Sequence, residues 1–183
     1  MGGPVLAIEL AEAVPVAVIE RLRELLAGLS TRLEEKRVGE YDLQIQAESL
    51  GIADADEIDG HRPFLVSLMG PGIGDEWIFE AEHPEEVDQE ALIGFTPTHA
   101  VNVIALANEP IDHVATALLT VAIMDVIGGV ANAELAQGQR AIVDGLPGLI
   151  ATTRTSWPTL PAAYGSAEFI KAWSRQTGFR LLT

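Results

Sequence analysis

Apolar and polar residues follow one another along this chain in patterns that predict both strands and helices. Residues 4–10 are a short apolar run and are expected to form the first strand. Residues 41–47 alternate apolar and polar side chains, as a half-buried strand does, while residues 63–69 are apolar enough for a more fully buried one. Further strands are expected at residues 77–79, 99–106, 130–135 and 149–155.

Helical periodicity is clearest after Pro15, a residue suited to the first turn of a helix because its missing N–H is not needed there. The apolar positions that follow recur every three to four residues and predict one amphipathic helix with a single apolar stripe: Val18, Ile19, Leu22, Leu25, Leu26, Leu29 and Leu33. The mixed charges of this segment, Glu34 and Glu35 included, are expected on its solvated face.

A long apolar helix is predicted from Pro110 to residue 127, where Gly128 and Gly129 stop it. Its central part, residues 114–124, is too short to span a bilayer and runs into Asp125, so we expect a buried core helix. Short helices are predicted at residues 84–92 and 166–175, the second capped by Ser166.

Strands and helices are mixed without the strict alternation of a doubly wound sheet. We therefore expect an α+β fold, in which a mostly antiparallel sheet forms one layer and helices packed on it form the other. The chain of 183 residues, 48% of them hydrophobic, is the size of a single domain with one core.

The charge of the chain is very unevenly distributed. The formal net charge is −16, and residues 40–90 contain fifteen acids and a single Arg or Lys, Arg62, so this stretch carries −14 of it. Like charges concentrated in one region repel one another, which costs stability, so solubility alone explains the asymmetry poorly. The pattern favours an acidic surface that attracts a basic partner and disfavours nucleic acid and anionic membranes.

Other features narrow the class of protein further. The chain has no cysteine, which excludes disulfides, thiolate nucleophiles and cysteine metal sites. No basic segment precedes the first apolar run, so it does not resemble a secretory signal, and we expect a cytoplasmic protein.

Metal and cofactor motifs are not convincing. Asp54, Asp56 and Asp59 resemble a calcium loop, but the third acid is displaced by one position and Leu65 stands where the closing glutamate belongs. The glycine-rich residues 70–74 lack the lysine and hydroxyl of a phosphate-binding loop, and the four histidines have no paired spacing. We expect neither a metal nor a cofactor.

Asp112 and His113 form the one pair suited to acid–base catalysis. They follow Pro110 in the first turn of a predicted helix, where an aspartate also stabilises free backbone N–H groups and the positive end of the helix dipole. No nucleophile or oxyanion motif accompanies the pair, so the structural interpretation is favoured and an enzyme is not expected.

An ordered set of short motifs is similar to a known family. The motifs are Arg62-Pro-Phe-Leu-Val66, Gly94-Phe-Thr-Pro97, Ala107-Asn108 with Asp112-His113, Gly128-Gly129, and Phe169-Ile-Lys-Ala-Trp173 with Gly178-Phe179. In this order they resemble a family of uncharacterised bacterial proteins that are suspected immunity proteins of polymorphic toxin systems. The resemblance implies a protein that binds and neutralises a toxin domain and that contains no established catalytic residue.

The resemblance and the charge together lead to one function hypothesis. We expect an immunity protein whose acidic surface occludes the basic active-site cleft of a cognate toxin. Trp77 would supply an aromatic anchor in that surface, although a tryptophan is more often a core residue. The alternatives are a small enzyme that uses Asp112 and His113, and an acidic chaperone or adaptor for a basic secreted protein. The predicted contact residues are Asp54, Asp56, Glu57, Asp59, Asp75, Glu76, Trp77, Glu80, Glu82, Glu85 and Glu86.

Overall fold

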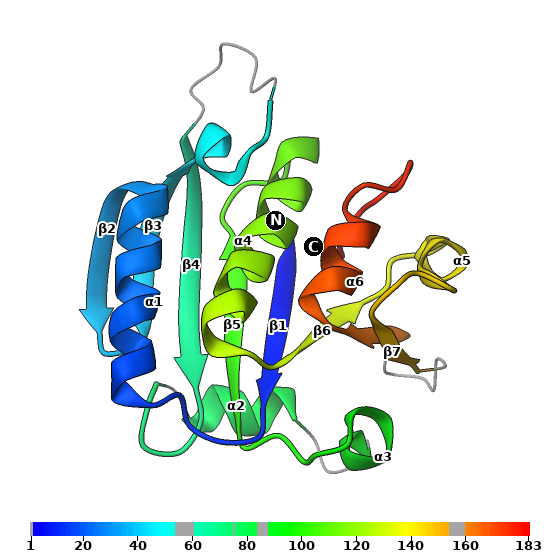
Figure 1. The fold of residues 1–183 in the computed structure, drawn as a ribbon, viewed down its shortest axis with the longest axis horizontal. Helices are drawn as coiled ribbons and strands as arrows, with labels where there is room; N and C mark the ends of the chain where they lie inside the picture. The colour runs from blue at the N-terminus through cyan, green and yellow to red at the C-terminus, as the bar shows by residue number, and fades with distance from the viewer. Residues whose placement is uncertain (1, 54–60, 75, 84–87, 154–159) are drawn as a thin grey trace.

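A computed structural model describes residues 2–53, 61–74, 76–83, 88–153 and 160–183. In these residues eight strands form one antiparallel sheet in the order β2-β3-β4-β5-β1-β6-β8-β7 (Figure 1). The strands are β1 (Val5–Leu10), β2 (Ser30–Arg37), β3 (Glu40–Gln46), β4 (His61–Met69), β5 (His99–Ala105), β6 (Val130–Glu134), β7 (Leu149–Thr152) and β8 (Ala162–Gly165). The first strand in the chain therefore lies in the middle of the sheet.

One face of the sheet is covered by the helices α1 (Val16–Leu29), α4 (Pro110–Ile127) and α6 (Ala167–Trp173). α4 lies between the other two and packs against both of them and against β1 and β5. The core fills the space between these helices and the sheet, and it includes Leu22 of α1, Ile8 of β1 and Trp173 of α6. The α+β prediction is confirmed.

α4 has the bounds that Pro110 and Gly128 predict. Among the described residues it is the helix long and apolar enough to cross a membrane, with a mean hydropathy of 1.5 over 18 residues. Half of that length is buried inside the protein, as in the core helix of a soluble protein. The predicted buried core helix is therefore confirmed.

The opposite face of the sheet is covered by fewer and shorter helices. The short helix α2 (Glu76–Glu82) crosses it at the lower end of the molecule in Figure 1, and α3 (Gln89–Ile93) lies beside β7. The remaining helices are the 3₁₀ turn η1 (Ala47–Leu50) and α5 (Gln139–Val143). Much of this face is consequently open, which matters for the polar residues that point to it.

Two of the predicted elements are wrong. The helix after Pro15 ends at Leu29, and the segment that contains Leu33, Glu34 and Glu35 is strand β2, paired with β3. Residues 77–79 belong to helix α2 and not to a strand. In the first case an edge-strand pairing outweighs a local helical pattern, because propensity is a weak guide where tertiary contacts compete.

Candidate functional site

Helix α2 presents its acidic and aromatic side chains to solvent. None of its seven residues is buried, Glu76 and Glu80 are exposed, and Trp77 is 75% exposed. Trp77 is thus not a core residue, and it is the most exposed of the large hydrophobic side chains among the described residues. Tryptophan is enriched where protein interfaces form, so an exposed indole marks a candidate contact residue.

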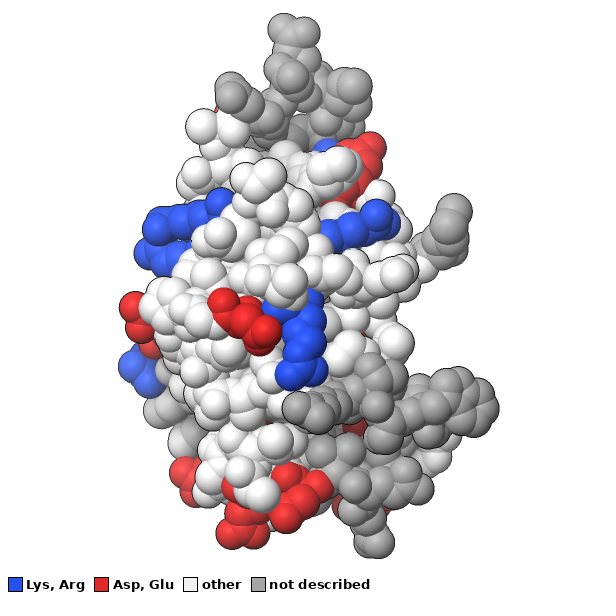
Figure 2. All heavy atoms as spheres, turned by 90° about the vertical axis from the view of Figure 1, so that its right-hand side faces the viewer, with Lys and Arg blue, Asp and Glu red and all other residues white. Residues whose placement is uncertain are grey.

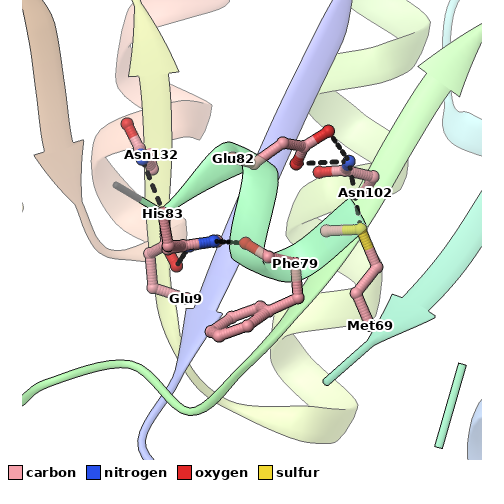
Figure 3. Close-up of polar contacts among 7 residues, drawn as sticks. All are labelled: Glu9, Met69, Phe79, Glu82, His83, Asn102 and Asn132. Atoms are coloured by element: carbon pink, nitrogen blue, oxygen red, sulfur yellow. Dashed lines mark hydrogen bonds and ion pairs between the residues drawn. The ribbon is translucent and has the colours of Figure 1, made fainter. Parts of the chain in front are cut away.

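A buried polar contact holds the C-terminal end of α2 on the central strand. Glu9 of β1 is fully buried, and its Oε2 lies 2.7 Å from Nε2 of His83, which directly follows α2 (Figure 3). The other carboxylate oxygen of Glu9 accepts a hydrogen bond of 2.7 Å from Nδ2 of Asn132 on β6. Nδ1 of His83 lies 2.8 Å from the carbonyl oxygen of Phe79, whose ring stacks on the imidazole at 4.1 Å.

Both partners of His83, a carboxylate and a carbonyl, are hydrogen-bond acceptors. The doubly protonated imidazolium satisfies both of them, because each ring nitrogen then donates. Burial alone would lower the pKa of His83, but the hydrogen bond and negative charge of Glu9 outweigh it, and the net effect is a raised pKa. The contact is therefore an ion pair that forms most fully when His83 is protonated.

A second contact joins α2 to the neighbouring strand β5. Nδ2 of Asn102 donates to both carboxylate oxygens of Glu82, at 2.9 and 3.1 Å. Asn102 is 5% exposed, and its Oδ1 is buried without a hydrogen-bond partner. Leaving such an acceptor unpaired costs about 1–3 kcal/mol. Glu82 therefore positions α2, whereas Glu76 and Glu80 are free to meet a partner.

The end of the molecule that carries α2 and α3 is acidic. No Lys or Arg occurs in the sequence between Arg62 and Arg140, the stretch that supplies both helices. On the face in Figure 2, the charged side chains visible at this lower end are acidic, whereas acidic and basic side chains are interspersed above it. The described acids near this end are Glu12, Glu76, Glu80, Glu82, Asp88 and Glu90.

Several of the predicted contact residues lie outside the described residues. These are Asp54, Asp56, Glu57, Asp59, Asp75, Glu85 and Glu86, and the calcium-like loop falls with them. The described segments that flank residues 54–60 are η1 and the beginning of β4, whereas α2 follows the end of β4. β4 has nine residues and spans about 27 Å, so η1 and the beginning of β4 lie at the opposite end of this strand from the turn that leads to α2. The described contact residues that the structure brings together are those of α2.

Asp112 and His113 have structural contacts at the N-terminus of α4. Asp112 is fully buried and forms a capping box with Glu109: its Oδ2 accepts a hydrogen bond of 2.7 Å from the backbone N–H of Glu109. Arg62 lies near both acids, 2.5 Å from Glu109 Oε2 and 3.6 Å from Asp112 Oδ1.

His113, which follows Asp112 in the sequence, contacts the C-terminal segment of the chain. Nδ1 of His113 accepts a hydrogen bond of 3.1 Å from the backbone N–H of Leu181. Burial first, and then the charge of Arg180, lower the pKa of His113, although Asp112 opposes this. A neutral imidazole suits that acceptor role. In the described residues the pair therefore stabilises the helix start and the C-terminal segment.

The sequence prediction did not include the polar residues of the open sheet face. Glu9, Asn102 and Asn132 come from three neighbouring strands that are far apart in the sequence. A signal was present, because Glu9 and Asn102 each interrupt an otherwise apolar strand at a position that points away from the core. Among the described residues no group of three or more His, Asp or Glu side chains is arranged to hold a metal ion.

Fold and site together define an α+β protein with one covered sheet face and one partly open polar face that bears an acidic helix. Residues 2–183 match the model of a family described as a family of unknown function (DUF6368), and the chain belongs to this family. No curated protein and no solved structure matches the chain at a significant level.

Proposed function

We propose that this protein is an immunity protein, which binds a basic toxin domain through helix α2 and blocks the active site of that toxin. The observation that carries the proposal is the exposed Trp77, which stands between Glu76 and Glu80 on a helix fixed to the sheet. The resemblance described from the sequence motifs supports the toxin as the partner. The protein acts in the cytoplasm of the cell that makes the toxin.

The chemistry of α2 suits a rapid and tight association. Burying an indole in a partner's pocket removes some 150–250 Å² from water, enough for a central contact of an interface. The surrounding carboxylates would pair with the basic residues that a nuclease or nucleotide-modifying toxin uses to hold its substrate. Acidic complementarity of this kind accelerates encounter, and the acceleration weakens as salt screens the charges.

The anchoring of α2 supports the same role. Two contacts with the buried residues Glu9 and Asn102, made by His83 and Glu82 respectively, hold the helix before any partner arrives. A helix fixed in its bound geometry loses less conformational entropy on association than a mobile one. The exposed side chains of α2 are thus already held in a fixed position before binding.

The proposal predicts that a toxin domain is encoded beside the gene of this protein, and the test measures the association and dissociation rates of the two proteins at several salt concentrations. We expect nanomolar binding and an association rate that falls as salt rises. The variant Trp77→Ala should weaken binding by about 2 kcal/mol or more, mainly through faster dissociation. The double variant Glu76→Lys, Glu80→Lys should slow association and abolish protection of cells from the toxin.

Matched controls lie on the helix layer, away from α2. Val16→Ala changes another exposed hydrophobic side chain, 73% exposed on α1, and Glu20→Lys reverses an exposed charge on the same helix. Both controls should bind like the parent protein. Full neutralisation by the α2 variants would refute the placement, and binding only to an unfolded or precursor toxin would point to a chaperone instead.

A further inference from the structure

A hollow lies on the open face of the sheet, between α2 and the C-terminal residues. Its volume is about 520 Å³, and it is lined by Val5, Ala7, Glu82, Asn102, Asn132 and Glu134, with further residues of α2 and the C-terminus. This volume is within the usual range of small-molecule sites. The α2 surface proposed to meet the partner is formed by other residues, Glu76, Trp77 and Glu80.

Strand register explains why the hollow is there. Ala7 of β1 is paired with Asn102 of β5 on one side and with Asn132 of β6 on the other. Residues paired in this way across neighbouring strands point to the same face, so two carboxamides flank a methyl group. The row continues to Ser67 of β4 and Tyr164 of β8. The small side chain in the centre leaves space that larger neighbours would fill.

The lining offers acceptors. Glu82 and Glu134 contribute carboxylates, and the described lining contains no Lys, Arg or His. Because Nδ2 of Asn102 donates to Glu82, the orientation of this amide is fixed, and its unpartnered Oδ1 is turned toward β1 (Figure 3). A buried acceptor without a partner is uncommon in folded proteins, and here it belongs to one of the residues that line the hollow. The apolar part of the wall comes from Val5, Ala7, Ala81 and Leu182.

We propose that this hollow is a binding site for an alkyl chain that ends in a guanidinium or primary ammonium group. The cation would lie against Glu82 and Glu134, one N–H would reach Oδ1 of Asn102, and the methylenes would pack on Val5 and Ala7. Two sources supply this chemistry: a free small molecule, or an arginine or lysine side chain of a protein partner. The site does not depend on the toxin assignment.

The test uses the 183-residue protein with butylguanidinium as ligand and butylurea as its uncharged counterpart, measured by titration calorimetry. We expect saturable binding of butylguanidinium with one site per chain, about tenfold or more tighter than that of butylurea, because charge-assisted hydrogen bonds are the stronger ones. Equal affinity for the two compounds, or no saturable binding, would overturn the proposal.

Two variants locate the site. Ala7→Leu should abolish binding by filling the hollow while leaving every charge in place. Glu134→Gln, at an exposed position, should weaken binding about fivefold, the size expected for one solvent-accessible ion pair. Glu168→Gln makes the same charge change at an exposed position on α6 and should have no effect.

The outcomes remain decisive if one variant fails to fold. If circular dichroism shows that Ala7→Leu does not fold, the comparison of Glu134→Gln with Glu168→Gln tests the site by itself. Equal binding of butylguanidinium by these two variants would contradict the site. Competition between butylguanidinium and the basic partner would identify the source as a partner side chain. Binding of butylguanidinium without such competition would identify a free small molecule, and either result supports the site.

Discussion

Nε2 of His83 lies 2.7 Å from Oε2 of the fully buried Glu9, although 74 positions separate the two residues in the sequence. This ion pair joins the end of an otherwise exposed helix to the central strand of the sheet. Asn132 holds the second oxygen of Glu9, so neither carboxylate oxygen lacks a partner. The buried carboxylate of Glu9 therefore holds the C-terminal end of α2 on the sheet.

We expect this contact to make stability depend on pH. The pKa of His83 is raised in the folded protein, so its stabilisation is complete below the unfolded pKa and is lost as pH rises through the folded pKa. His83→Gln should be less stable than the parent by about 1.5–3 kcal/mol at pH 5, and the difference should shrink in mildly alkaline solution. Urea unfolding between pH 5 and 9, with an NMR titration of His83, measures this.

The control for that experiment is His61→Gln, at an exposed position on β4. This variant should remain close to the parent protein at every pH. A stability difference for His83→Gln that stays the same across the whole pH range would contradict the assigned ion pair.

Replacement of Trp77 and of Trp173 by alanine should change the free energy of unfolding by very different amounts. Trp77 is 75% exposed, so Trp77→Ala should change the free energy of unfolding by no more than about 0.5 kcal/mol. Trp173 is fully buried, stacks on Phe169 and donates a 3.1 Å hydrogen bond to Gln139. Trp173→Ala should cost about 3–5 kcal/mol. Denaturant unfolding compares the two, and a large loss for Trp77→Ala would show that the indole packs in the fold.

Asp112 and His113 allow the catalytic alternative to be tested separately from the fold. Asp112→Ala removes the capping box and should destabilise the protein by about 1–2 kcal/mol. Asp112→Asn keeps the side-chain size, and His113→Ala removes the imidazole. If these two variants are folded and still protect cells from the toxin, as we expect, the acid–base hypothesis is rejected. Loss of protection with an unchanged fold would favour it.

The turn between β4 and α2 should tolerate substitution at one glycine and not at another. A Cβ on Gly74 would lie 1.7 Å from the carbonyl oxygen of Leu68, whereas a Cβ on Gly72 would meet open space. Both glycines have a positive φ, +73° and +78°, so both alanine variants carry backbone strain of about 1–3 kcal/mol. Only Gly74→Ala adds a backbone clash. Thermal unfolding should therefore place it well below Gly72→Ala, and equal midpoints would contradict this reading of the turn.

Local pattern predicted the parts of the fold in which sequence and environment agree. α4 begins at Pro110 and ends before Gly128 because proline suits the first turn and a positive φ at glycine ends the helix. The apolar runs became β1, β4, β5 and β6 because they are buried against the helices. The concentration of acids was equally visible, since a count of charges needs no coordinates.

The local sequence pattern gave wrong predictions where contacts with residues far away in the sequence determine the structure. Leu33 continues a helical repeat, yet it lies on β2, an edge strand that pairs on one side with β3. The exposure of Trp77 could not be predicted either, because an aromatic residue is buried only if the fold brings a surface to cover it.

The sequence by itself thus determined the mixed α+β architecture, the long core helix and the acidic imbalance, all of which follow from periodicity and composition along the chain. Only the tertiary structure decided that Glu9 meets His83, that Asn102 lines a hollow and has a buried, unpaired oxygen, and that Ala7 leaves that hollow open. A buried charge or amide is stable only through partners from other strands and helices, and the strand order, the register and the placement of α2 on the sheet specify which partners those are.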